Sequence, residues 1–270
     1  MTYQHILYVV DDRVATITLN RPKQLNALNE ALVEEFVQAV ATADKDPDVR
    51  VLVVTGAGGV AFSAGYDMKE SAAKKDHSLA AYRARTDWDL RFVMSVWDCS
   101  KPVIAMIDGH CLAGAFELAM FCDSRYCSDN SSFACLEARF ASAVTTIMPW
   151  LIGQRSRTLI YTGDKFDGAE AFRLGLVDKV FSKANLHDEV MKIAKRMSRV
   201  SVDFLKLNKR SINLTFEAMG FKNSLQYGAE LAAVMLAQGS PEGDRFNEIR
   251  QAEGLAAALQ WRDQQFAPYE

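Results

Sequence analysis

The 270-residue sequence lacks several features that would assign it to a common functional class. It has no apolar stretch approaching the ~18 residues that span a bilayer, and its start lacks a basic segment followed by an apolar run. Its four histidines do not have the clustered spacing of a zinc site. These absences predict a cytoplasmic protein with no membrane segment, no secretion signal and no metal centre.

Motifs of nucleotide chemistry and of nucleophilic catalysis are missing as well. No G-x-G-x-x-G run with a downstream acidic residue is present, and there is no G-x-x-x-x-G-K-[ST] phosphate loop. No G-x-S-x-G elbow surrounds a serine, and His110, beside an apolar run, is interpreted as a structural histidine. Nucleotide redox chemistry, phosphoryl transfer and nucleophilic catalysis therefore lose their usual support.

Neither the charge nor the cysteine content indicates a particular class of partner or site. The 31 basic and 34 acidic residues are well mixed, so the net charge of −3 gives no general electrostatic reason to bind nucleic acid or an anionic membrane. The one basic patch, Lys206, Lys209 and Arg210, is interpreted as a solvated helix face. Five cysteines, an odd number in apolar or strand-like segments, are expected to be reduced core residues: Cys99, Cys111, Cys122, Cys127 and Cys135.

The sequence does contain a repeated order of strand, glycine-rich turn and helix. The β-rich runs at 5–10 and 14–19 predict a hairpin. Uninterrupted apolar runs at 50–55 and 102–107 predict strands that are buried on both faces, and glycines follow each of them. This order predicts an α/β fold with layers of helices and right-handed crossovers.

Helical patterns dominate the second half of the chain. They predict a long helical run over 201–237 and an amphipathic helix over 241–263, after a strand at 176–181. We therefore divide the chain into an α/β body, residues 1–200, and a C-terminal helical region, residues 201–270. Apolar positions of the helical region could pack on the body or on another subunit, and the pattern leaves both open.

The stretch 104–123 is the first candidate site, with a buried strand, a turn and a helix that begins near Gly114. A helix N-terminus has unpaired N–H groups and a partial positive charge, so it can stabilise an oxyanion. Residues i and i+3 share a helix face, so the Gly114 N–H and the Glu117 carboxylate could address one site. Alternatively, Gly114 only permits close packing and Glu117 only interacts with the helix dipole.

A second glycine turn, 64–67, follows the strand at 50–55. In an α/β layer both turns would open on one crevice, where two backbone N–H groups would form an oxyanion hole. Glu137 is a second carboxylate in apolar sequence, although the local pattern also fits a surface glutamate. Burial raises the pKa of a glutamate toward neutrality, and paired acids of this kind suit the addition of water to a double bond.

Five segments together resemble the crotonase, or enoyl-CoA hydratase/isomerase, superfamily. They are LNRPKQLNALN at 19–29, FSAGYDMKE at 62–70, KPVIAMIDGHCLAGAFELAMFCD at 101–123, FACLEARF at 133–140 and EGLAAALQWRDQQF at 253–266. The resemblance implies a crotonase-like spiral of ββα units with a C-terminal helical trimerisation region, and assembly into homotrimers or hexamers. It also implies an acyl-CoA substrate, with coenzyme A as part of that substrate and no separate cofactor.

The resemblance further implies a reaction, the hydration of a 2-enoyl-CoA to a 3-hydroxyacyl-CoA or its reverse. The N–H groups of Tyr66 and Gly114 would polarise the thioester, Glu117 would activate the water that adds at C3, and Glu137 would supply the proton at C2. Residues implied to contact coenzyme A or the acyl group are Lys23, Leu25, Ala27, Ala64, Tyr66, Asp67, Met68, Lys69, Gly114, Arg262 and Phe266. Arg262 and Phe266 match a terminal helix that often reaches the coenzyme A of a neighbouring subunit.

The chain departs from the family pattern around Glu137. Leu136 stands where proline is typical, and 138–146 lacks the usual Pro-Gly and Gly-Gly-Thr character. Because this segment lines the acyl end of the pocket in relatives, an atypical acyl group or an altered reaction is a further expectation. The alternatives are double-bond isomerisation, thioester hydrolysis and C–C bond cleavage, and outside enzymology RNA binding through Lys206, Lys209 and Arg210.

Overall fold

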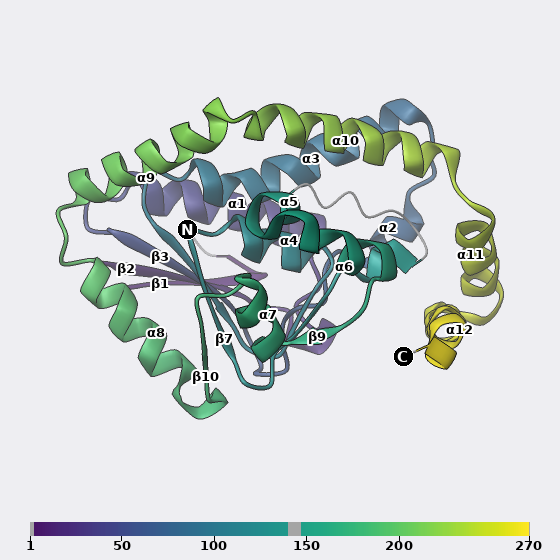
Figure 1. Cartoon of the computed structure of the whole chain (residues 1–270), viewed down its shortest axis with the longest axis horizontal. Coiled ribbons are helices and arrows are strands. Elements are labelled where there is room, and N and C mark those ends of the chain that lie inside the picture. The colour runs from purple at the N-terminus through teal and green to yellow at the C-terminus, as the bar shows by residue number, and fades with distance from the viewer. Residues whose placement is uncertain (1–2, 140–146, 270) are drawn as a thin grey trace.

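The fold is built on two β-sheets covered by helices, in a computed structural model that describes residues 3–139 and 147–269 (Figure 1). The larger sheet has the strand order β1-β2-β3-β5-β7-β10, and the smaller one β4-β6-β8-β9. The strands are β1 (Ile6–Asp11), β2 (Val14–Leu19), β3 (Val51–Gly56), β4 (Ala61–Ser63), β5 (Val103–Ile107), β6 (His110–Leu112), β7 (Ser124–Ser128), β8 (Ser132–Ala134), β9 (Phe166–Asp167) and β10 (Lys179–Phe181).

Successive strands alternate between the two sheets. β3 leads into β4, β5 into β6 and β7 into β8, so each pair contributes one strand to each sheet. Pairing is parallel from β2 to β10 and from β4 to β8, whereas the β1–β2 hairpin and the β8–β9 pair are antiparallel. Helices follow these strand pairs, which confirms the predicted spiral of ββα units.

Helices cover the larger sheet on both faces (Figure 1). The helices are α1 (Glu30–Lys45), α2 (Met68–Ala73), α3 (Leu79–Asp98), α4 (Gly114–Phe121), α5 (Met148–Ile152), α6 (Ser156–Thr162), α7 (Gly168–Leu174), α8 (Lys183–Met197), α9 (Val202–Ala218), α10 (Phe221–Gln238), α11 (Pro241–Glu253) and α12 (Leu255–Phe266). Of these, α11 and α12 lie to one side of the larger sheet (Figure 1). Short 3₁₀ turns are η1 (Pro22–Gln24), η2 (Leu136–Arg139), η3 (Gly153–Arg155) and η4 (Ala267–Tyr269).

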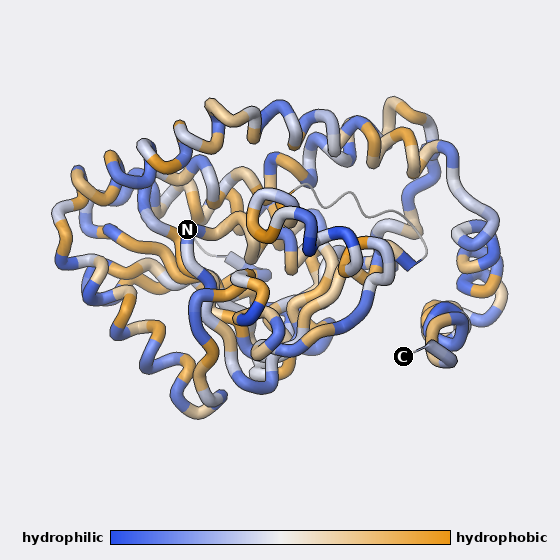
Figure 2. Tube along the Cα trace, viewed as in Figure 1, coloured by the Kyte–Doolittle hydropathy of each residue, from blue (hydrophilic) through white to orange (hydrophobic). Residues whose placement is uncertain are grey.

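The core explains why the central strands read as unbroken apolar runs. Helices α1, α3 and α4 pack on one face of the sheet, and α8 packs on the other, where Leu186 and Val190 meet Val51 and Ile104. Figure 2 shows the strands as largely hydrophobic and α8 as alternately hydrophobic and hydrophilic. All five cysteines are buried and outside disulfide bonds, as predicted. No helix in the described ranges is long and apolar enough to cross a membrane.

Three predicted elements differ from the structure in their bounds. The run 201–237 is two helices, α9 and α10, because Gly220 adopts a left-handed backbone with φ of 99°. The run 241–263 is likewise divided at Gly254, whose φ is 93°. Positive φ favours glycine and ends a helix. The strand expected at 176–181 begins only at Lys179. The division of the chain at residue 200 stays a prediction.

Lys209 corrects the interpretation of the basic patch on α9. Its side chain is buried, and its ammonium group donates to Asp123 Oδ2 at 2.7 Å, Val96 O at 2.8 Å and Lys101 O at 3.2 Å. It therefore fastens α9 to the end of α4 and to the loop before β5. A group of cations that faces solvent cannot include this residue, which weakens the RNA-binding alternative.

Candidate active site

One large cavity, of about 1300 Å³, opens between the two glycine turns and the helices α3, α10 and α12. Tyr66, Gly114, Glu117 and Glu137 all line it. The structure therefore brings together the four residues that sequence analysis placed at the centre of the chemistry. The glutamate at 137 is not on the outer surface, because its Oε2 atom is buried.

The first turn connects β4 to α2 and can approach the second turn only because it contains glycine. Gly65 has φ of +89°, and a Cβ atom there would lie 2.8 Å from Ala113 Cβ and 2.9 Å from Leu112 O. The next residue, Tyr66, has a backbone N–H that donates to no residue in the described part of the chain. This amide is therefore free to donate to a ligand.

The segment 21–28 holds the first turn in place. The Arg21 guanidinium donates to Asp67 Oδ2 at 3.0 Å and to Ala27 O at 2.6 Å. The buried Asn26 side chain donates to Ala57 O and Ala61 O at 2.9 and 2.8 Å. The polar residues of this motif thus have a structural role, because they fix the loop that carries Lys23 and Leu25 beside the cavity.

The second turn begins α4 and has an unusual backbone. Ala113 precedes the helix with φ of 51° and ψ of −129°, a conformation that costs a non-glycine residue of order 1–3 kcal/mol. It leaves the Gly114 N–H without an acceptor among the described residues, as at Tyr66. A Cβ atom at Gly114 would lie 2.4 Å from Tyr66 Cε2, so the tyrosine ring packs directly on this glycine.

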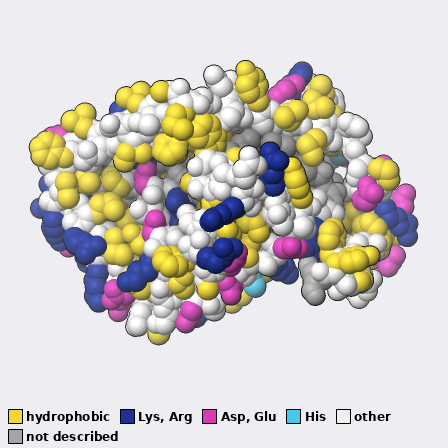
Figure 3. Space-filling model, viewed as in Figure 1, with side chains coloured by type: hydrophobic (Ala, Val, Ile, Leu, Met, Phe, Trp, Pro, Cys, Tyr) yellow, Lys and Arg dark blue, Asp and Glu magenta, His cyan; other side chains and the backbone are white. Residues whose placement is uncertain are grey.

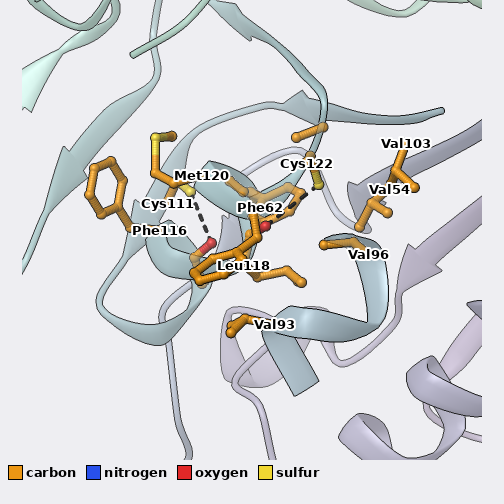
Figure 4. Packing of buried hydrophobic residues seen from close by; sticks show 14 of the residues in the cluster. Val54, Phe62, Val93, Val96, Val103, Cys111, Phe116, Leu118, Met120 and Cys122 are labelled. Carbon is orange, nitrogen blue, oxygen red and sulfur yellow. Dashed lines mark hydrogen bonds between the residues drawn. The ribbon is translucent and has the colours of Figure 1, made fainter. Parts of the chain in front are cut away.

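Glu117 lies in the first turn of α4, on a helix whose other residues are almost all buried. Figure 4 shows Leu118 of this helix near Val93 and Val96 of α3, whereas Phe116 lies on the other side of the helix, where its ring contacts Phe133 and Phe166. Only the side of α4 that carries Glu117 faces the cavity, where this side chain is partly accessible. Core packing thus determines where this carboxylate points.

Glu137 lies on the short turn η2, which is held by Arg139 two residues later. The Arg139 side chain donates to Thr162 O and to Asp164 Oδ1, both at 2.9 Å. Its guanidinium carbon lies 4.3 Å from the centre of the Phe266 ring on α12. The position of the second carboxylate therefore depends on contacts that the nearly buried Arg139 side chain makes with residues 162–164 and with α12.

Both glutamates have a raised pKa. Burial, then the charge of Glu137, then that of Asp89 raise the pKa of Glu117 to about 8. Burial raises the pKa of Glu137 to about 7, and its own backbone N–H opposes this. The two acids interact, so their titration belongs to the pair. Near neutral pH such a pair can hold one proton, with one member as acid and the other as base.

Two residues of the cavity that sequence analysis missed are Arg85 and Asp89 on α3. Arg85 Nε donates to Asp89 Oδ1 at 2.9 Å, and the two side chains are only 20% and 28% exposed. The available signal was the pairing of opposite charges at i and i+4, on a helix that also buries Phe92 and Val93. That pattern is also typical of exposed helix faces, so it did not single out these residues.

Most of the residues expected to contact coenzyme A line the cavity. They are Lys23, Leu25, Ala27, Ala64, Tyr66, Asp67, Met68, Lys69, Gly114 and Arg262. Phe266 is not in this lining, and its ring packs on Arg139 instead. Residues 140–146, where an unusual acyl end was expected, lie outside the described residues. Within 3–139 and 147–269, no group of three or more His, Cys, Asp or Glu side chains could hold a metal ion.

Comparisons with known proteins agree on one family. A family model for enoyl-CoA hydratase/isomerase matches residues 10–253. Crotonyl-CoA hydratase of Syntrophomonas wolfei is 32% identical over 98% of this chain and 99% of its own. A peroxisomal Delta(3,5)-Delta(2,4)-dienoyl-CoA isomerase of Arabidopsis thaliana is 32% identical over 84% of this chain and 86% of its own. A crystal structure of an enoyl-CoA hydratase/isomerase from Xanthobacter autotrophicus Py2 superimposes with a TM-score of 0.95 at 34% identity, covering 98% and 99% of the two chains.

Proposed function

The chain belongs to the enoyl-CoA hydratase/isomerase family and is an enzyme of the hydro-lyase type, and we propose that it hydrates a 2-enoyl-CoA thioester to a 3-hydroxyacyl-CoA. The observation that carries this proposal is the presence of two carboxylates with raised pKa and two unpaired backbone amides in one cavity. Hydration needs these groups together, since it requires an acid, a base and a site for negative charge.

The amides of Tyr66 and Gly114 form the proposed oxyanion hole. Two N–H donors on the thioester oxygen withdraw electrons from the C2=C3 double bond and stabilise the enolate-like charge that develops when C3 is attacked. Gly114 also begins α4, so the positive end of the helix dipole adds to this stabilisation. Since the donors are backbone atoms, the tyrosine side chain at 66 changes the shape of the pocket and leaves the donor unchanged.

The two glutamates divide the proton transfers. In hydration, ionised Glu117 removes a proton from the water that adds at C3, while protonated Glu137 delivers a proton to C2. Because the pKa of both glutamates is raised, the pair can hold one proton near neutral pH, and the other arrangement has this proton on Glu117. That state is suited to the reverse reaction, in which Glu117 protonates the leaving hydroxyl and Glu137 removes the proton at C2. Because the reaction is reversible, both proton arrangements take part in each cycle.

Cationic side chains at the mouth of the cavity support coenzyme A as part of the substrate. Lys23 and Lys69 are exposed beside the lining residues Leu25 and Ala27, where lysines can bind phosphate groups. Arg262 is contributed by α12 of the same chain. No cofactor is required for this reaction, because coenzyme A enters and leaves as part of the substrate.

Assembly into a homotrimer, or into a hexamer of two trimers, forms part of the proposal. Helices α9 and α10 expose Phe204, Leu207, Tyr227 and Leu231, each between 59% and 70% accessible in the single chain. Figure 3 shows hydrophobic side chains along the edge formed by these helices. Exposed apolar positions of this kind are typical of surfaces that pack on another subunit.

The test is the loss of the enoyl absorbance of crotonyl-CoA when the enzyme is added, with the product analysed by mass spectrometry. Hydration adds 18 mass units, whereas double-bond isomerisation leaves the mass unchanged, and thioester hydrolysis or C–C cleavage releases a smaller product. We expect the hydrated product. A panel of thioesters that gives only isomerised, hydrolysed or cleaved products would replace hydration with that other reaction.

A further inference from the structure

The acyl end of the cavity has two unlike walls. The α10 wall is apolar or small, with Leu225, Gly228, Ala229 and Leu236. The adjacent wall, on α3 and the loop before it, is mixed, since apolar side chains such as Trp88, Leu90 and Val93 alternate there with polar ones. It presents Arg85, Asp89, Thr86, Tyr82 and His77. Most of these polar groups already have partners in the protein, since His77 forms a hydrogen bond with Tyr82, Thr86 donates to Arg83 O and Asp89 accepts from Arg85. The outer N–H groups of Arg85 are the ones that a plain hydrocarbon chain would leave unsatisfied.

Arg85 is the rigid centre of this wall. Asp89 accepts from its Nε at 2.9 Å, and its guanidinium carbon lies 4.8 Å from the centre of the Tyr66 ring and 5.2 Å from that of Trp88. The Nη1 and Nη2 atoms donate to no residue that the structure describes. The Arg85 side chain is thus held by the Nε–Asp89 hydrogen bond and by the rings of Tyr66 and Trp88. Its Nη groups remain available to donate to a ligand.

Arg85 lies in the part of the cavity that also contains the proposed catalytic groups. The ring of Tyr66 contacts Arg85 and also packs on Gly114, whose amide belongs to the proposed oxyanion hole. Asp89, the anchor of Arg85, is close enough for its charge to raise the pKa of Glu117. The loop that carries Lys23 and Leu25 is a different part of the lining, before α1. Through Tyr66 and Asp89, Arg85 is thus next to the groups proposed to act on the thioester.

We propose that Arg85 binds a carboxylate at the far end of the acyl group, so that the substrate is the 2-enoyl-CoA of a dicarboxylic acid. This proposal rests on the proposed hydration of a thioester and adds the class of acyl group. A guanidinium presents parallel N–H groups in the geometry of a carboxylate, and it cannot lose its charge. Asp89 holds Arg85 through the hydrogen bond that it accepts from Nε, which leaves the Nη groups to bind the ligand.

A neutral acyl group fits this wall less well. A methyl group would leave the outer N–H groups of Arg85 unpaired in a partly buried site, at a cost in affinity. A hydroxyl group could accept from only one of the parallel N–H groups of the guanidinium. Arg85 could also bind an anion of another source, namely a phosphate of coenzyme A. The binding experiment distinguishes the two, because all thioesters carry the same phosphates and only some carry an acyl carboxylate.

The first experiment measures the binding of two saturated thioesters that cannot be hydrated. Pentanedioyl-CoA ends in a carboxylate, and pentanoyl-CoA has a methyl group in its place. We expect isothermal titration calorimetry to give at least about 30-fold tighter binding of pentanedioyl-CoA, in line with the strength of charged hydrogen bonds. Arg85→Met should remove this difference, and Arg85→Lys, which keeps the charge without the fork, should retain about a tenth of it.

The second experiment compares turnover of pent-2-enedioyl-CoA and pent-2-enoyl-CoA. Arg85→Met should lower kcat/KM about 100-fold more for the first substrate than for the second, and circular dichroism shows whether the variant is folded. Arg91→Met is the matched control, since Arg91 lies on α3 and pairs with Glu34 outside the cavity lining. Arg91→Met should leave kcat/KM unchanged for both substrates.

The outcomes separate this proposal from the function on which it rests. Hydration of pent-2-enoyl-CoA with no preference for the dicarboxylic substrate would overturn the carboxylate site and leave the hydratase function intact. Equal weakening of both thioesters by Arg85→Met would assign Arg85 to the coenzyme A phosphates and also overturn it. Hydration of neither thioester would overturn the hydratase function and this proposal together.

Discussion

The two carboxylates of the site are held in opposite ways. Glu117 lies on α4, a helix buried in the core, whereas Glu137 lies on a four-residue 3₁₀ turn fastened by Arg139 to a loop and to the C-terminal Phe266. One acid therefore depends on the same packing that stabilises the fold. The other depends on a short turn and on contacts of the Arg139 side chain with segments distant in the sequence. Damage to the two supports should appear in different measurements.

The largest expected effect comes from removing either acid itself. Glu117→Gln and Glu137→Gln should each lower the kcat for crotonyl-CoA about 10²–10⁴-fold, because general acid–base catalysis contributes this much. Binding of the saturated butanoyl-CoA should change much less. A Glu137→Gln enzyme with nearly normal kcat would remove Glu137 from the mechanism and leave Glu117 as the only acid of the pair.

The support of Glu117 is tested at the far end of α4. Lys209→Met removes the buried ammonium group that donates to Asp123 and to the carbonyls of Val96 and Lys101, and we expect a loss of about 1–3 kcal/mol in the free energy of unfolding. Denaturant unfolding followed by circular dichroism measures this. The kcat of the folded fraction should stay close to normal. A stable Lys209→Met protein with low kcat would contradict the idea that this support acts through the fold.

The pH dependence of stability should also reveal the burial of Glu117. Its pKa is raised in the folded state, so the stability it provides is present below the unfolded value near 4.5 and is lost as the pH rises through about 8. Glu117→Gln removes this loss. The variant should therefore gain on the order of 2–3 kcal/mol relative to the wild type between pH 5.5 and 8.5. Parallel curves for the two proteins would mean that Glu117 is solvated.

The smallest expected effect concerns the support of Glu137. Phe266→Ala removes the ring that packs on Arg139, and we expect kcat to fall about 5-fold with little change in the free energy of unfolding, as for a contact worth about 1 kcal/mol. Tyr269→Ala is the control, because Tyr269 is 90% exposed at the same end of the chain. If both variants lower kcat equally, the effect comes from the C-terminus in general.

The same contrast explains what the sequence could predict. The strands at 50–55 and 102–107, the helix start at Gly114 and the pair Gly114–Glu117 follow from local periodicity and helix geometry, and the structure confirms them. The place of Glu137 in the cavity came from the resemblance, because its local pattern also fits a surface residue. Contacts between distant segments determine that place, and local sequence does not report them.

Long-range contacts also explain the errors. Lys209 has the sequence neighbours of a surface lysine, yet Asp123, 86 residues away, draws it into the interior. Arg85 and Asp89 resemble any exposed ion pair on a helix until the rings of Tyr66 and Trp88 are placed beside them. The ring of Phe266 contacts Arg139, in the segment of Glu137, which local sequence does not indicate, and its place at the coenzyme A of a neighbouring subunit stays a prediction. In each case a partner far away in the chain decides the role.

Ala113 has a consequence for how this enzyme would adapt to heat. A glycine there would adopt φ of 51° and ψ of −129° without strain, so the chain keeps a residue that makes its folded state less stable than it could be. The methyl group of Ala113 also lies against Gly65, across the gap between the two turns. Replacing Ala113 with glycine would relieve the backbone strain and would also remove the methyl contact with Gly65. Selection for thermal resistance and selection for a stiff reaction centre would therefore act on this methyl group in opposite directions.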